Sequence, residues 1–157
     1  MFTHILCATD VSEDADRALA YARRIAIGDG AELHIVHVVE KLAAGRAAGQ
    51  NARVDEQERY DKLRLESSEM SESGIKTTLH MPRANVGAVA DCVSRIASDN
   101  DVDLIIVGTR GRSALVGAVL GSVTQRLLHV SPCPVLAVPH PHAKRENAVV
   151  EELAATS

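Results

Sequence analysis

The sequence predicts an α/β fold with an open, five-stranded parallel sheet and helices on both of its faces. Short runs rich in Val, Ile and Leu, typical of buried strands, alternate with segments whose apolar residues recur at three- and four-residue steps, typical of helices. Such alternation favours right-handed crossovers, which place helices on both sides of a parallel sheet. The expected architecture is Rossmann-like.

The composition indicates one globular domain without affinity for nucleic acid. The chain has 157 residues, the usual size of one domain, and 46% of them are hydrophobic. Its net charge is -4, so no overall positive field attracts a phosphate backbone. With two Tyr, one Phe and no Trp, it also lacks a platform for base stacking.

The first half of the chain predicts two strands, each followed by a helix. A strand is expected at residues 5–9, and the helix after it is capped by Ser12 and ended by Gly28 and Gly30. A second strand follows at 31–39. Residues 41–53 show no periodicity and are expected to form a loop.

The second half continues the alternation. The charged segment at 54–73 has few apolar residues and is expected to be an exposed helix. The remaining elements are a strand at 75–81 stopped by Pro82, a helix at 86–97, a strand at 102–107 that runs into Gly108, a helix from about Ser122 and a strand at 134–138.

Two strand ends carry residues suited to binding. The first strand ends at Asp10, and the fourth ends in Gly108-Thr109-Arg110-Gly111, followed by nine residues and then Gly121 at a helix start. Ligands of open α/β sheets bind outside the carboxyl ends of the strands, where the strand order reverses. If these two strands are neighbours, their ends form one site.

The glycine-rich segment predicts an anion site. Gly108 and Gly111 allow positive φ angles and a close approach of a phosphate to the backbone, and Gly121 does the same at the helix entrance. The first helical residues would offer backbone amides, and two hydroxyls, at the positive end of the helix dipole. These residues are Ser122, Val123 and Thr124.

Charged side chains complete the predicted site. Arg110 is a stronger candidate for a phosphate contact than Arg112, since loop arginines are often only solvated. Asp10 would bind ribose hydroxyls or help hold Mg²⁺, because a carboxylate repels a bare triphosphate. The structural alternatives are that Asp10 caps the first helix and that Ser122 forms a capping box with Gln125.

Catalytic motifs are missing from the sequence. Neither GxxxxGK[ST] nor GxGxxG occurs, so no P-loop lysine is present. Hydrolysis of ATP needs a positioned water and charge stabilisation at the γ-phosphate, and Asp10 is the one base available for it. The pattern favours binding over turnover.

The cysteines and the termini suggest no further chemistry. Cys7, Cys92 and Cys133 lie in or beside apolar runs, without the spacing of a zinc or redox site, and are expected to be buried, reduced thiols. The first residues do not resemble a signal peptide, and no apolar run approaches the length of a membrane span. A cytoplasmic location without membrane insertion is expected.

The motifs together resemble a known family. Gly108-x-x-Gly111, nine residues and Gly121-Ser122 are followed by a proline-flanked last strand, Ser131-Pro-Cys-Pro-Val-Leu136. With Ile5-Leu-Cys-Ala-Thr-Asp10, this pattern resembles the universal stress protein family over residues 2–139. The complete glycine spacing is similar to that of the ATP-binding branch.

The resemblance implies a fold like that of the adenine nucleotide alpha hydrolases, with strand order 3-2-1-4-5. It implies ATP, or AMP or ADP, together with Mg²⁺. Ala8 and Asp10 would line the ribose and adenine side, and Val38 would pack near the base. The residues expected around the phosphates are Gly108, Arg110, Gly111, Gly121, Ser122, Val123 and Thr124.

The resemblance also implies a homodimer, formed through the edge strand between Pro134 and Val138. The domain is expected at 1–139, with a C-terminal tail at 140–157. His140 and His142 in that tail are expected to be solvated and not to bind a metal, because no third ligand is near. A short docked helix around Leu153 is a further possibility.

The leading functional hypothesis is a nucleotide-dependent stress-response or regulatory protein with a protein effector. One alternative is a slow ATPase or phosphotransfer protein, in which Asp10 holds the metal and Ser122 or Thr124 lies near the γ-phosphate. The other is a nucleotide-independent, chaperone-like interaction module, whose partner binding would not change when the glycines are replaced.

Overall fold

The computed structural model describes residues 1–41, 50–111 and 120–139. In chain order the elements are β1 (His4–Ala8), α1 (Glu13–Asp29), β2 (Glu32–Val36), β3 (Val39–Lys41), α2 (Gln50–Glu72), β4 (Thr77–His80), β5 (Arg83–Asn85), α3 (Val89–Asp99), β6 (Leu104–Gly108), α4 (Ser122–Val130) and β7 (Val135–Val138). The predicted loop at 41–53 is shorter than expected, since β3 includes Lys41 and α2 begins at Gln50.

The main sheet is parallel and has the order β4-β2-β1-β6-β7. The expected order 3-2-1-4-5 is not matched as written. It numbers only the five predicted strands, whereas the chain also contains the short strands β3 and β5, which were not predicted. These two pair with each other in a separate parallel sheet. The adjacency that the site requires is present: β1 lies between β2 and β6.

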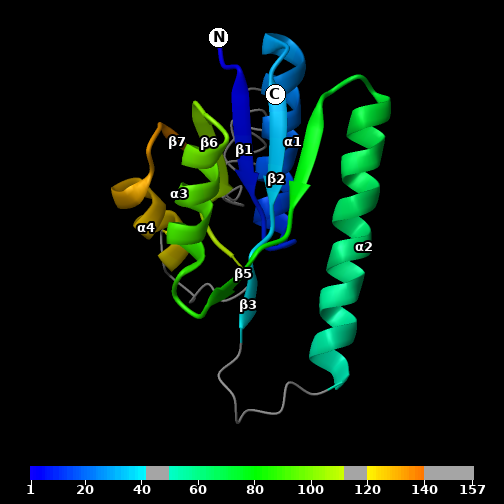
Figure 1. Cartoon of the computed structure of the whole chain (residues 1–157), viewed down its shortest axis with the longest axis vertical. Helices are drawn as coiled ribbons and strands as arrows, with labels where there is room; N and C mark the ends of the chain where they lie inside the picture. The colour runs from blue at the N-terminus through cyan, green and yellow to red at the C-terminus, as the bar shows by residue number, and fades with distance from the viewer. Residues whose placement is uncertain (42–49, 112–119, 140–157) are drawn as a thin grey trace, which may run out of the picture.

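Helices cover both faces of the main sheet (Figure 1). Side chains alternate between the faces of a strand, so Ile5 and Cys7 of β1 pack with α1 and α2, while Leu6 and Ala8 pack with α3 and α4. The result is two apolar layers on either side of the sheet, which hold the strand ends in fixed positions.

Helix α1 begins and ends where the sequence predicts. The Ser12 side chain caps it by accepting a hydrogen bond from the Ala15 N–H at 3.3 Å. Gly30 ends it with a φ of 68°, a left-handed conformation that glycine adopts without strain. The predicted cap and stop are confirmed.

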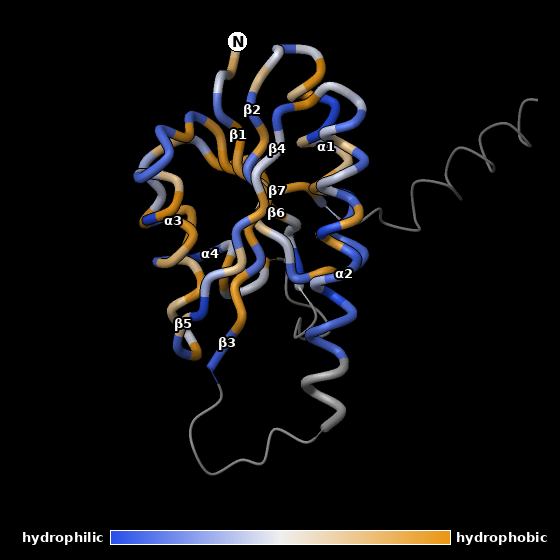
Figure 2. The backbone as a smooth tube through the Cα atoms, turned by 45° about the vertical axis from the view of Figure 1, so that its right-hand side comes forward, coloured by the Kyte–Doolittle hydropathy of each residue, from blue (hydrophilic) through white to orange (hydrophobic). Residues whose placement is uncertain are grey.

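Helix α2 is less exposed than its composition suggests. Figure 2 shows a largely hydrophilic helix, but Leu63 and Met70 are buried in the core shared with α1. An ion pair between Lys62 and Asp16 (Nζ to Oδ2, 2.8 Å) joins it to α1 as well. The prediction of an exposed helix is therefore right for most of its surface and wrong for these two side chains.

The cysteines are free thiols, of which Cys7 and Cys92 are buried and Cys133 is half-buried. Burial raises the pKa of the Cys7 thiol to about 12, and it also raises the pKa of Cys133. The expected tail at 140–157, including His140 and His142, lies outside the described residues. Within the described part of the chain, no helix has the length and apolar character to cross a membrane.

Candidate functional site

The carboxyl ends of β1 and β6 lie side by side. Ala8, the last residue of β1, pairs with Val107, and β6 ends one residue later at Gly108. The Thr9 N–H donates to the Val36 carbonyl (2.9 Å) and so extends β1 beside β2. Asp10 and the loop that follows β6 therefore leave the sheet at the same edge, as the sequence predicts.

A strained turn at residues 9–12 joins β1 to α1. The Val11 N–H donates to Thr9 Oγ1 (3.0 Å), and the Ser12 N–H donates to Asp10 Oδ1 (3.1 Å). Val11 has a φ of 62°, a conformation that is rare for β-branched residues and concentrates at functional sites. Ser12, and not Asp10, is the helix cap, so the capping role considered for Asp10 is wrong.

The two halves of the predicted site meet at Asp10 and Gly111. A Cβ added to Gly111 would lie 2.6 Å from Asp10 Oδ2. Glycine at position 111 therefore leaves room for the carboxylate to lie against the loop that follows β6.

Of the two properties that glycine offers, the site glycines use close approach and not a positive φ. Among the described glycines, positive φ occurs at Gly30, Gly74 and Gly87. A Cβ on Gly108 would lie 3.0 Å from the backbone carbonyl of Asp14, so this glycine lets α1 pack tightly against β6. Gly108 thus faces a helix, and its role is in packing.

Gly121 forms the start of α4. It is the N-cap, with φ −72° and ψ 157°, and its N–H donates to the Thr109 carbonyl at 2.7 Å. The first bond within the helix runs from the Gln125 N–H to the Gly121 carbonyl, so the N–H groups of the three residues between them point out of the helix end. No side chain in the described part of the chain caps α4, so the capping box of Ser122 and Gln125, the alternative to an anion site, is not formed.

The first residues of α4 differ in what they can offer a ligand. The Thr124 side chain is buried, and its hydroxyl donates to the Gly108 carbonyl at 2.8 Å. Val123 is half-buried and packs on the core, whereas Ser122 is exposed. Of the two predicted hydroxyls, that of Ser122 is therefore the one at the surface, and Thr124 holds α4 on β6.

Of the remaining predicted residues, those that the structure describes follow or end the strands at this edge of the sheet. Arg110 is half-buried, and Arg112 lies outside the described residues. Ala8 is 7% exposed, and Val38, which follows β2, packs against the same apolar layer. Both have a packing role that needs no ligand.

Two buried polar residues at these strand ends were not among the predicted site residues. His37 is 2% exposed and Thr9 is 7% exposed. The Nδ1 of His37 lies 2.9 Å from the Thr9 carbonyl, and its Nε2 lies 2.8 Å from Glu56 Oε1 on α2. The available signal was a histidine inside an apolar run, directly before Val38.

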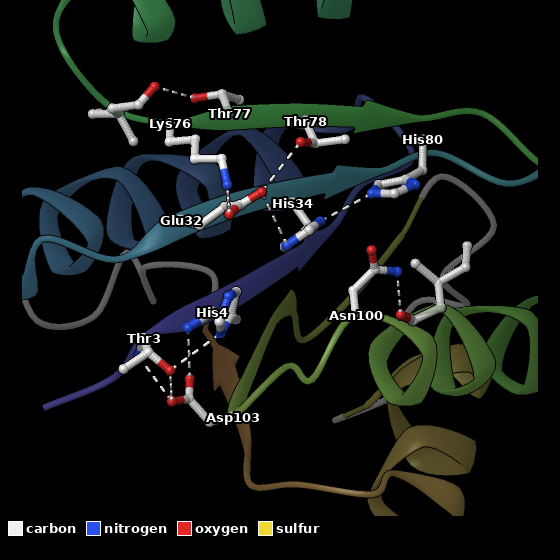
Figure 3. A network of polar contacts seen from close by, with 12 residues as sticks. Thr3, His4, Glu32, His34, Lys76, Thr77, Thr78, His80, Asn100 and Asp103 are labelled. Carbon is white, nitrogen blue, oxygen red and sulfur yellow. Dashed lines mark hydrogen bonds and ion pairs between the residues drawn. The ribbon is translucent and has the colours of Figure 1, made fainter.

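A second polar cluster crosses β2 and β4 (Figure 3). His34 Nδ1 lies 3.0 Å from His80 Nε2, and His34 Nε2 lies 3.7 Å from Glu32 Oε1. Burial lowers the pKa of both histidines, and the hydrogen bond from Lys76 lowers the pKa of Glu32. Among the described residues, no group of three or more His, Cys, Asp or Glu has the arrangement of a metal site.

Comparison with known proteins identifies the family. The model of the universal stress protein family matches residues 1–139. The chain belongs to the universal stress protein family. A member from Thermus aquaticus, described as the universal stress protein in the QAH/OAS sulfhydrylase 3′ region, is 35% identical over 144 residues, which cover 88% of this chain and 99% of that protein.

Solved structures of other family members share the fold. The universal stress protein MJ0577 of Methanocaldococcus jannaschii is 30% identical over 164 residues, covering 94% of this chain and 98% of that protein. The structure of MJ0577 gives a TM-score of 0.75 at 27% identity, covering 91% and 99% of the two chains. A universal stress protein in complex with cAMP gives a TM-score of 0.63 at 25% identity, covering 87% and 96%.

Proposed function

We propose that this universal stress protein binds ATP and acts as a nucleotide-dependent, dimeric stress-response or regulatory protein. The observation that carries the proposal is the meeting of Asp10, Gly111 and the start of α4 at one edge of the sheet. Backbone N–H groups at a helix start attract phosphate, and a carboxylate beside them suits a ribose or a cation. The cAMP complex of a family member supports an adenine nucleotide as the ligand class.

Each part of the nucleotide has a place in this proposal. The N–H groups of Ser122, Val123 and Thr124 and the Arg110 guanidinium bind the phosphates. Ala8 and Val38 offer an apolar surface near the adenine. Gly111 and Gly121 keep the backbone accessible, and Gly108 supports the site through the packing of α1.

Asp10 binds the ribose hydroxyls or Mg²⁺. Proteins usually hold Mg²⁺ with one or two carboxylates together with substrate phosphates, and not with a complete cage of side chains. One carboxylate beside a phosphate site fits that donor set, and no cluster of three acidic or histidine ligands is present among the described residues. The ion would neutralise phosphate charge next to Asp10, so metal and nucleotide would bind together.

The site favours binding over hydrolysis. The Thr124 hydroxyl donates a hydrogen bond to the Gly108 carbonyl, so the hydroxyl available near a γ-phosphate is that of Ser122. No P-loop lysine is present in the sequence. The slow ATPase alternative predicts single-turnover hydrolysis above the buffer background that falls in Asp10→Asn, and equal background rates in both proteins would exclude it.

The proposed dimer uses β7. This strand is at one end of the main sheet, and Leu136 on it is 38% exposed. An apolar edge strand with unpaired backbone groups is stabilised by pairing with a second copy. Size measurement by light scattering should give twice the chain mass at micromolar concentration, and a monomer would contradict this part of the proposal.

Calorimetry with ATP and Mg²⁺ tests the central proposal. A Cβ on Gly121 would lie 3.6 Å from the Thr109 carbonyl, an ordinary contact, so Gly121→Val fills the space between loop and helix start without a backbone clash from its Cβ. We expect its ATP affinity to fall about tenfold or more, a loss of about 1.4 kcal/mol or more.

Gly28→Val is the matched control, because nothing lies within 4 Å of a Cβ at this position on α1, and its affinity should equal that of the wild type. No ATP affinity at millimolar concentration, or equal affinities in Gly121→Val and the wild type, would contradict the proposal. Mass spectrometry of nucleotide released on denaturation of the purified protein would identify the ligand directly.

A further inference from the structure

His37 contacts both the end of strand β1 and helix α2. It follows β2 and is buried between the end of β1 and helix α2. One ring nitrogen contacts the Thr9 carbonyl, and the other contacts the carboxylate of Glu56. Arg59, one turn further along α2, contacts the second oxygen of Glu56 at 3.0 Å.

The protons of this contact can be counted. A backbone carbonyl can only accept, so Nδ1 of His37 carries a proton and donates it to Thr9. The 2.8 Å contact between Nε2 and Glu56 Oε1 then holds one further proton, because two lone pairs would repel at that distance. His37 therefore makes directional contacts on both sides and does more than fill space.

The Thr9 side of this contact leads directly to the proposed site. Thr9 Oγ1 accepts the N–H of Val11, the residue with positive φ, and the next hydrogen bond of the turn goes from Ser12 to Asp10. A shift of the Thr9 backbone would therefore change the position of the Asp10 carboxylate. The Glu56 side leads to α2, which packs on the opposite side of His37 from that turn.

We infer that His37 is a positioning residue that couples helix α2 to the turn at residues 9–12. Movement of α2 alters the turn that carries Asp10, and a ligand that fixes Asp10 stabilises the position of α2. Reciprocity follows from linkage, since a coupling between two sites acts equally in both directions. The second half of this inference rests on the proposed nucleotide site, and the first half does not.

The test replaces Glu56 and not His37, because the buried histidine is part of the core, whereas the Glu56 side chain is 29% exposed and alanine favours helices. Hydrogen exchange of the Val11 and Ser12 amides is measured first, without nucleotide. Glu56→Ala should raise both exchange rates about tenfold, the effect of a coupling of about 1.4 kcal/mol. Glu56→Gln should restore the wild-type rates, because its amide can donate to a neutral His37 Nε2.

Lys62→Met is the matched control. It removes another polar contact of α2, the ion pair with Asp16 on α1, and leaves the contacts of His37 in place. It should leave the Val11 and Ser12 rates unchanged. Unchanged rates in Glu56→Ala, or an equal rise in Lys62→Met, would overturn the coupling.

The second measurement adds ATP and Mg²⁺ and follows the amides of residues 55–60. Nucleotide should slow their exchange in the wild type and in Glu56→Gln, but not in Glu56→Ala. If the wild type binds nucleotide and Glu56→Ala responds as the wild type does, the inference is wrong and the proposed function stands. If the wild type does not bind, the proposed function is wrong, and the nucleotide-free experiment alone decides the coupling.

Discussion

The carboxylate of Asp10 occupies the space that a side chain at position 111 would need. A Cβ on Gly111 would lie 2.6 Å from Asp10 Oδ2, the mobile end of a side chain, and not against backbone. Strand β1 and the loop after β6 thus meet through one carboxylate and one glycine. This relationship makes the proposed nucleotide site and the stability of the fold separable by mutation.

Gly111→Ala should weaken ATP binding with little effect on stability. The carboxylate can move away from the new methyl group at the cost of weakening the hydrogen bond that it accepts from the Ser12 N–H, so the free energy of unfolding should fall by about 1 kcal/mol or less. The displaced Asp10 should lower the affinity for ATP and Mg²⁺ about five- to tenfold, as calorimetry and urea unfolding would show. Wild-type affinity in this variant would show that the position of Asp10 does not matter for binding.

Gly108→Ala should have the opposite profile. Here the new Cβ would lie 3.0 Å from the backbone of Asp14, which cannot rotate away. Overpacking between α1 and β6 should lower the free energy of unfolding by about 1–3 kcal/mol. A variant as stable as the wild type in urea unfolding would contradict the packing role assigned to Gly108.

Thr124 should prove structural. Thr124→Val leaves the buried Gly108 carbonyl without its side-chain donor, and should lower the free energy of unfolding by about 1–3 kcal/mol. Thr124→Ser keeps the hydroxyl and should retain more of that stability. If both variants were fully stable but bound ATP weakly, the hydroxyl would instead act on the ligand.

Val11 offers a test of backbone strain. Val11→Gly and Val11→Ala both remove the packing of the side chain, but glycine alone accepts a φ of 62° without penalty. The glycine variant should therefore be more stable than the alanine variant by about 1 kcal/mol, against their usual order. Thermal unfolding of the pair measures this, and the usual order would show that the turn relaxes.

The pair of His34 and His80 should make the fold sensitive to mild acid. Burial lowers the pKa of both histidines below the ordinary 6.5, so the unfolded chain binds more protons as the pH falls. Above pH 6.5 both rings are neutral, and the free energy of unfolding keeps its full value. It falls as the pH falls from 6.5 through the lowered pKa values of the two rings. Glu32 opposes this change by favouring the charged form of both rings.

His80→Gln should therefore flatten the loss of stability as the pH falls below 6.5, measured by urea unfolding at each pH. Gln can still hydrogen-bond to His34, so the contact is kept while one titrating ring is removed. His129→Gln on α4, outside this cluster, serves as the control and should follow the wild type. Parallel curves for wild type and His80→Gln would contradict the prediction.

The features of the fold that depend on apolar periodicity could be predicted from the sequence. The five long strands, the cap at Ser12 and the stop at Gly30 follow from local patterns, and the two strand ends meet because parallel strands end at one edge. Strands β3 and β5 have three residues each, too few for a pattern to appear.

Other features depend on contacts between distant residues. A glycine indicates that a side chain is not tolerated, but the reason at Gly108 is the approach of Asp14 and not a positive φ. The partner of His37 is 19 residues away on a helix with little apolar pattern. The histidine inside an apolar run is visible in the sequence, but neither its partner Glu56 nor the approach of Asp14 to Gly108 leaves a local signal.

The close approach of α1 to β6 at Gly108 also sets the mechanics of the molecule. Backbone packed this tightly against backbone cannot slide, so α1 and the central strands behave as one rigid frame. Helix α2 is mostly hydrophilic, and a few buried side chains, Leu63 and Met70 among them, anchor it to that frame. In the coupling proposed through His37, a ligand that displaces the turn at residues 9–12 would therefore shift α2 relative to α1.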